Sequence, residues 1–124
     1  MDFNAFRNCT NEVAPVGAVW TNPGGGVSTI ISVSAERISY RRGKSVMSVS
    51  IWDLFDAYAL YRGRRVSTTE LRAFRPVVFD SAARPAGHSC NCTIFFLLLE
   101  RMGVVEGIQG KGVCGNPFYV DISL

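Results

Sequence analysis

Six consecutive apolar residues, Ile94 to Leu99, constrain the fold of this chain more than any other feature. They lie within a stretch from Cys92 to Met102 that has the length of a helix of about three turns. Gly103 follows directly, and glycine readily ends a helix. A helix that is apolar on every face must be surrounded by other elements. The sequence therefore predicts a buried helix over residues 92–102 at the centre of the core.

The same run is too short for a membrane-spanning helix, because crossing a bilayer takes about 18 or more apolar residues. The first residues, Met1-Asp2-Phe3-Asn4, lack the cationic and apolar regions of a secretory signal. Of the 124 residues 48% are hydrophobic and 19% charged, a balance that excludes a disordered chain. We expect one compact domain over residues 1–124 that is cytoplasmic and does not associate with membranes.

The N-terminal third of the chain has the pattern of strands. Residues 1–15 show no clear period, and we expect them to be irregular. Between residues 16 and 50, short runs with a period of two are separated by turn signals such as the stretch 22–26, Asn-Pro-Gly-Gly-Gly. This part predicts an antiparallel β-meander of three or four strands. In one of its runs the β-branched residues recur at every second position and are expected to share a face: Val27, Thr29, Ile31 and Val33.

From Ser50 onward the period becomes that of helices. Ser50 with Asp53, and Ser67 with Glu70, have the spacing of capping boxes, so a helix is expected to begin at each serine. Val104 and Val105 follow the 92–102 helix, and a glycine-rich turn then leads to a last strand over 118–122. The sequence thus predicts an α+β fold: an N-terminal antiparallel β-meander, three helices with the apolar one buried, and a C-terminal β-hairpin.

The cations suggest a function for such a domain. The formal net charge is only +3, but eleven of the thirteen cations are arginine, whose planar guanidinium suits phosphate. They gather at 37–44 and at 62–65. If the two clusters share a face, they would form a track for the DNA or RNA backbone, with Tyr40 or Trp52 available for stacking. The predicted contacts of this non-enzymatic nucleic-acid-binding module are Arg37, Arg41, Arg42, Lys44, Arg62, Arg64, Arg65 and Lys111.

Two other interpretations of the same features remain open. The arginines at 62–65 would also suit the C-terminus of the preceding helix, whose dipole attracts cations. Alternatively, the chain is a protein-interaction or adaptor module. It would then accept a strand at the edge of the meander, or form a homodimer through an apolar patch that contains Trp20 or Trp52.

A cluster of metal-ligating and nucleophilic residues precedes the apolar helix. His88, Cys90 and Cys92, joined by Cys114, would offer four ligands to zinc, although each neighbouring pair is separated by one residue instead of the usual two to four. A cysteine at a helix N-terminus can also act as a nucleophile. The interpretation we favour is structural: Ser89 or Asn91 caps the helix and Cys92 packs in the core. We expect no cofactor, and an enzyme is the less favoured class.

The stretch Gly110 to Gly115 matches the pattern G-x-G-x-x-G of dinucleotide-binding loops. Those loops follow a strand and open a helix, whereas this one precedes Asn116-Pro117 and a short run of strand residues near residue 124. The sequence therefore predicts a hairpin turn here, with Lys111 at its tip.

Overall fold

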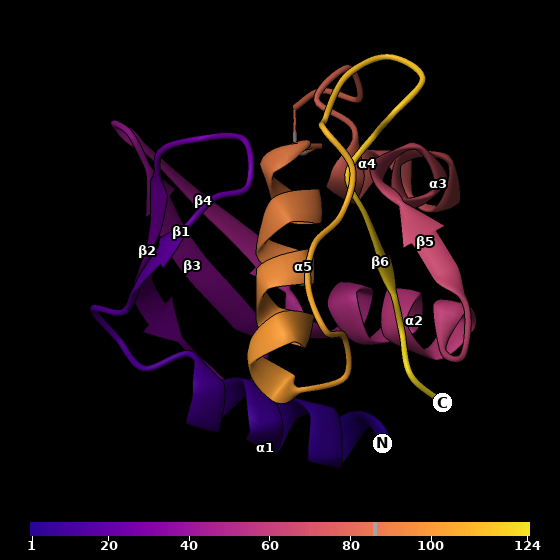
Figure 1. Ribbon diagram of the computed structural model, residues 1–124. Coiled ribbons are helices and arrows are strands. Elements are labelled where there is room, and N and C mark those ends of the chain that lie inside the picture. The colour runs from indigo at the N-terminus through magenta and orange to yellow at the C-terminus, as the bar shows by residue number, and fades with distance from the viewer. Residues whose placement is uncertain (86) are drawn as a thin grey trace.

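The computed structural model describes residues 1–85 and 87–124, and it confirms the α+β fold. Helix α5 (Cys90–Met102) lies in the middle of the molecule. Figure 1 shows the four-stranded sheet on one side of α5, and α2, α3, β5 and β6 on the other. Helix α1 crosses the end at which α5 finishes. Because α5 is enclosed in this way, all six residues of its apolar run are buried.

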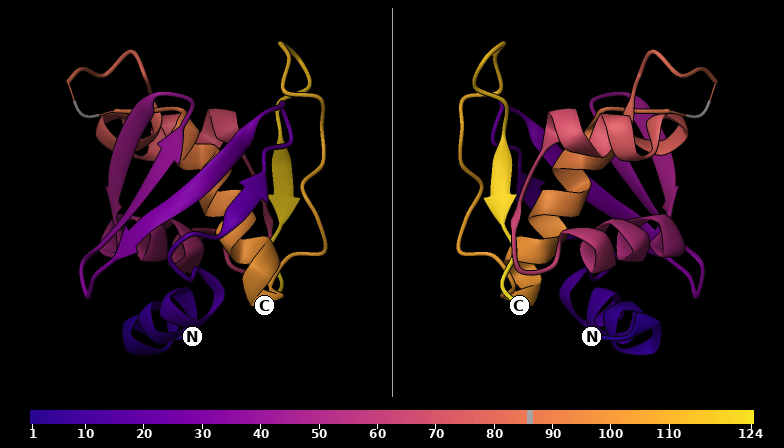
Figure 2. Two further views of the ribbon diagram at one scale, coloured as in Figure 1. Left: turned by 90° about the vertical axis from the view of Figure 1, so that its left-hand side faces the viewer. Right: turned by 90° about the vertical axis from the view of Figure 1, so that its right-hand side faces the viewer.

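The four-stranded sheet is an antiparallel meander in the order β1-β2-β3-β4, as predicted. Its inner face packs on α5 through residues such as Ile38, Tyr40 and Val49, whereas no helix or strand of the described residues covers its outer face in Figure 2. The strands are β1 (Val19–Thr21), β2 (Val27–Val33), β3 (Arg37–Arg42) and β4 (Ser45–Ser50).

The four β-branched residues predicted to share a face of β2 do not all share one. Ser28 and Ile30 point into the core, while Val27 is exposed. The pairing of β2 with β3 shifts between Ile30 and Ser32, and after this irregularity Val33 packs against the core. A bulge of this kind adds a residue and reverses the alternation, so no single period of two describes the strand.

Residues 1–15 are not irregular, because α1 (Phe3–Val13) occupies most of them. Asp2 is its N-cap, and its carboxylate accepts the backbone N–H of Ala5 at 2.8 Å. Phe6 and Thr10 are fully buried, and Phe3 and Val13 pack against the core. These four positions follow the helical spacing i, i+3, i+7, i+10, and thus give one apolar stripe to an otherwise polar helix.

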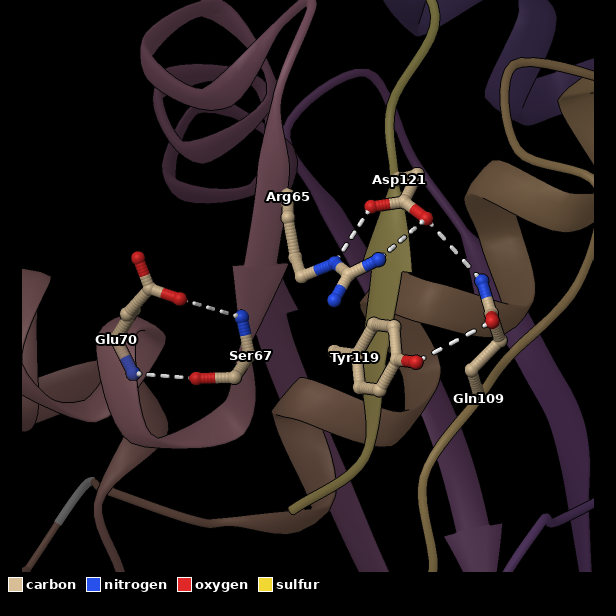
Figure 3. A network of polar contacts seen from close by, with 6 residues as sticks. All are labelled: Arg65, Ser67, Glu70, Gln109, Tyr119 and Asp121. Atoms are coloured by element: carbon tan, nitrogen blue, oxygen red, sulfur yellow. Dashed lines mark hydrogen bonds and ion pairs between the residues drawn. The ribbon is translucent and has the colours of Figure 1, made fainter. Parts of the chain in front are cut away.

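The next two helices begin where the sequence predicts. Helix α2 (Ile51–Tyr61) has Ser50 as N-cap, without a side-chain cap hydrogen bond. Helix α3 (Thr68–Phe74) opens with both hydrogen bonds of a capping box between Ser67 and Glu70, which Figure 3 shows. A further short helix, α4 (Pro76–Phe79), follows α3 directly and has Pro76 as its first residue.

The C-terminal strand β6 (Tyr119–Asp121) is present, but its regular partner is β5 (Arg65–Ser67), far away in sequence. In place of the predicted hairpin, the segment between α5 and β6 runs alongside β6 without forming a regular strand. Gln109 bridges Tyr119, and the carbonyl of Val104 accepts the N–H of Ser123. The two-stranded sheet β5-β6 closes the side of α5 opposite the meander (Figure 1).

Among the described residues, no helix combines the length and the apolar character needed to cross a membrane.

Candidate functional site

An open cavity of about 560 Å³ lies at the end of the molecule where α5 begins. Segments distant in sequence form its walls: the β1–β2 turn at Gly24, the end of β3 at Arg42, the first turns of α3 and α5, and the loop 112–118. Its volume falls in the range typical of small-ligand sites, about 300–1,000 Å³.

The polar lining of this cavity suits an anion. Two guanidinium groups, those of Arg42 and Arg72, face it together with several hydroxyl groups. No Asp or Glu is among the described residues of the lining. Arg42 also donates from Nη1 to Sγ of Cys90 at 3.4 Å. The hydroxyl-bearing residues of the lining are Thr68, Thr69, Ser89 and Thr93.

The arginines of the cavity differ from Arg65, Arg75 and Arg101, each of which pairs with a carboxylate. Within the described residues, Arg42 and Arg72 have no carboxylate within 4.0 Å. By contrast, Arg75 bridges Asp53 at 2.7 Å and Asp56 at 2.8 Å. That bridge also occupies the two carboxylates of α2, which are therefore not free for acid–base chemistry.

Arg65 is held in an exposed network on the β5–β6 sheet (Figure 3). It donates to both oxygens of Asp121, at 2.8 and 3.3 Å, and its guanidinium lies over the ring of Tyr119. Gln109 donates to the same carboxylate and accepts from the hydroxyl of Tyr119. The hydrogen bond from Arg65 lowers the pKa of Asp121 from its ordinary value.

Two more of the predicted arginine contacts are bound within the protein. Arg64 donates twice to the carbonyl of Leu60 and lies over the ring of Tyr61, so it serves the C-terminus of α2. Arg37 donates to the hydroxyl and the carbonyl of Ser48 on the outer face of the sheet.

The structure does not bring the two arginine clusters onto one face. The β3–β4 turn, which carries residues 41–44, lies at the upper left of Figure 1, and the bend 62–65 between α2 and β5 lies at the lower right. The sheet and α5 stand between them. No continuous phosphate track can therefore run through both clusters.

Cations do converge around the cavity. The β3–β4 turn, α3 and the loop after residue 109 all lie at the end where α5 begins. We call the cations of these segments the basic end: Arg41, Arg42, Lys44, Arg72 and Lys111. Glu70 and Asp80 belong to segments of the same end, but their carboxylates accept backbone N–H groups of Ser67 and Ala82.

Carboxylates gather at the opposite end. Glu12 lies on α1, Glu36 lies in the β2–β3 turn, and Glu106 follows α5. These segments lie at the lower end in Figures 1 and 2. Arg7 on α1, Arg101 in the last turn of α5 and the bend 62–65 lie there as well, so this end carries charges of both signs.

The four residues considered for zinc do not meet. His88 and Cys90 line one hollow next to β4, while Cys90 and Cys114 line the cavity described above. Cys92 is buried, as predicted, with Sγ 3.6 Å from the carbonyl of Phe79. No group of three or more His, Cys, Asp or Glu side chains among the described residues is placed to hold a metal ion.

Several predicted details of the site need correction. Tyr40 and Trp20 are buried, so neither can stack on a base or contribute to an exposed patch. Trp52 is 51% exposed, but its ring stacks on Phe3 at 3.5 Å between centroids. Ser89 precedes α5 without a side-chain cap hydrogen bond, and the side chain of Asn91 points into the core instead.

The sequence interpretation missed Arg72. Arg72 stands alone in sequence, outside both arginine clusters, so no run of cations marks it. A signal was nevertheless present: Arg72 lies one helical turn after Thr68, so the capping box that starts α3 also places both residues on one side of that helix.

No family model, no curated protein and no solved structure matches this chain.

Proposed function

We propose that this protein is a non-enzymatic binding module that holds a nucleic-acid strand by its phosphates at the basic end. The observation that carries the proposal is the cavity, which is lined by two carboxylate-free guanidinium groups, Arg42 and Arg72. Guanidinium groups bind phosphate oxygens in a planar, two-point geometry. A cavity of about 560 Å³ has room for one nucleotide unit. Lys44 and Lys111 belong to segments of the same end of the molecule and are available to neighbouring phosphates.

The form of the site favours a single strand. A duplex presents its phosphates on a broad cylinder, whereas a single strand can place one unit inside a hollow. The outer face of the sheet offers no exposed aromatic platform among the described residues, because Trp20 and Tyr40 point inward. We therefore expect binding through the backbone, with little preference for sequence.

The test is fluorescence anisotropy of a labelled single-stranded oligonucleotide at low salt. In the double variant Arg42→Gln/Arg72→Gln we expect affinity to fall by about tenfold or more, since two phosphate contacts are lost. The dependence of log K on log salt should also become shallower, by about 0.7 for each contact removed. A duplex of the same sequence is expected to bind more weakly.

The matched control is Arg62→Gln/Arg64→Gln, which removes the same charge at the other end of the molecule. At about 0.1 M salt it should leave affinity within about twofold, because attraction between charges more than roughly 10 Å apart is then largely screened. Absence of any anisotropy change with the unmodified protein contradicts the proposal. An equal loss in the two double variants contradicts it as well, because general charge would then explain the binding.

Edge pairing is a second candidate function, favoured by the position of β4. Within residues 1–85 and 87–124 this strand pairs only with β3 and ends the sheet, and its Val46 is 61% exposed. Such an edge can add a strand from a second copy of the chain.

If β4 mediates dimerisation, sedimentation should show a dimer whose population rises with concentration. Val46→Lys should shift the protein toward monomer, because a lysine at a sheet edge opposes pairing. The exposed Val16→Lys, outside the strands, serves as control. A monomer at every concentration excludes this function.

A further inference from the structure

The cavity at the basic end contains thiols that phosphate binding does not use. Cys90 and Cys114 both line it, beside Arg42 and Arg72. Both cysteines are free. Cys90 is the first residue of the thirteen-residue helix α5, and its Sγ receives a hydrogen bond from Nη1 of Arg42 at 3.4 Å. A nucleophilic sulfur therefore adjoins an anion-binding site.

The other two cysteines are poor nucleophiles. Burial raises the pKa of the Cys92 thiol to about 12. Burial, and to a lesser extent the charge of Glu12, raises the pKa of Cys9 on α1. Because the thiolate is the reactive form, each unit by which a pKa rises removes about nine-tenths of the nucleophile at neutral pH. Thiol chemistry should then concentrate at the cavity.

We infer that Cys90 is a modification site for small disulfides that carry carboxylates, a class represented by oxidised glutathione. The inference rests on the proposed function, since Arg42 and Arg72 would bind the carboxylates as they bind phosphate. Each half of oxidised glutathione is a tripeptide with two carboxylates. A half of that size is compatible with a cavity of about 560 Å³.

The reaction is a thiol–disulfide exchange. Sγ of Cys90, as thiolate, attacks one sulfur of oxidised glutathione and forms a new S–S bond. The S–S bond of oxidised glutathione breaks, and the second half leaves as a thiolate that takes up the proton released by Cys90. The protein thiol is oxidised and one glutathione is reduced, so no further oxidant is needed.

This modification would control the site. The attached tripeptide occupies the cavity, and its carboxylates lie where the ligand phosphates would bind. We therefore expect modified protein to bind a single-stranded oligonucleotide at least about tenfold more weakly, because both guanidinium contacts are blocked. Reduction with dithiothreitol should restore the affinity.

The experiment measures modification of the full chain by oxidised glutathione, with peptide mapping by mass spectrometry. We expect Cys90 to react at least about tenfold faster than Cys9 or Cys92. In a Cys114→Ser background, where Cys90 is the cavity's only thiol, Arg72→Gln should slow the reaction by about three- to tenfold, since it weakens the local field. The neutral bis(2-hydroxyethyl) disulfide is the matched reagent, and its rate should not respond to Arg72→Gln.

The results separate the two proposals. If Cys90 reacts no faster than Cys9 and Cys92, or if Arg72→Gln affects both reagents equally, the inference is wrong even when the reduced protein binds the oligonucleotide. If Cys90 reacts selectively while the reduced protein binds no oligonucleotide, the proposed function fails and the modification site stands. In the Cys90→Ser variant, treatment with oxidised glutathione should no longer change the affinity for the oligonucleotide, measured against the same variant without treatment.

Discussion

Asn91→Ala is expected to lower the free energy of unfolding by about 2 to 4 kcal/mol, a large share of the stability of a domain of this size. Asn91 is only 2% exposed, and its side chain joins three elements. Its Oδ1 accepts from the hydroxyl of Tyr40 on β3 at 2.7 Å, and its Nδ2 donates to the carbonyl of Val78 on α4 at 2.8 Å. Alanine leaves the buried hydroxyl of Tyr40 without a partner, at about 1 to 3 kcal/mol, and removes one hydrogen bond to Val78, at about 1 kcal/mol. The carbonyl of Val78 keeps the hydrogen bond from the N–H of His88.

Urea unfolding monitored by circular dichroism measures this loss. The control is Asn8→Ala, at an exposed position of α1, which should change stability by no more than about 0.5 kcal/mol. Tyr40→Phe gives a sharper test. It should destabilise the unmodified protein, but in the Asn91→Ala background it should be neutral or stabilising, because it then removes an unpaired buried hydroxyl. Additive effects of the two substitutions would show that the hydrogen bond contributes nothing.

The parts of the fold that the sequence could predict are those specified by local patterns. The apolar run of α5 requires burial whatever surrounds it, and the capping box at Ser67 and Glu70 defines the start of α3 by itself. Ile38 and Tyr40 alternate with polar residues, a pattern that puts both on one face of β3, although it did not show that this face is buried. Each of these features depends on neighbours within a few residues.

The errors concern features that depend on distant partners or on weak signals. Only tertiary pairing brings β6 to β5, because more than fifty residues separate the two strands. Likewise, α1 is polar overall, and its apolar stripe can be recognised as a buried face only once α2 and α5 are known to pack against it. The bulge in β2 cannot be recognised from the pattern of β-branched residues in the sequence.

The candidate site likewise combines a feature that local sequence predicts with others that depend on distant residues. The cations at 41–44 are adjacent in sequence, so a basic turn between β3 and β4 could be predicted. Arg42 lies at its edge. What sequence could not show is that α3 brings Arg72 to the same cavity, or that Asp121 pairs with Arg65. An arginine is available to a ligand only if the fold leaves it without a carboxylate, and that depends on residues far away in the chain.

Gly110→Ala is the second substitution with a large expected effect, and it tests the wall of the site. Gly110 has φ +87°, a region that costs a residue with a Cβ about 1 to 2 kcal/mol. A Cβ here would also lie 2.1 Å from the carbonyl oxygen of Pro117, which is backbone and cannot rotate away. The return at Gln109 and Tyr119 must therefore open, and we expect a loss of about 3 kcal/mol or more in unfolding free energy.

Gly115→Ala is the matched control, since Gly115 has φ +81° but no atom within 4 Å of the Cβ position. It should lose only about 1 kcal/mol, because it shares the backbone strain without the collision. The loop 112–118 forms one wall of the cavity, so Gly110→Ala should also weaken oligonucleotide binding where the protein remains folded. Equal destabilisation by the two substitutions would mean that the backbone at Pro117 moves away from the added Cβ at little cost. The cavity would then lack the rigid wall on which selective contact with a phosphate depends.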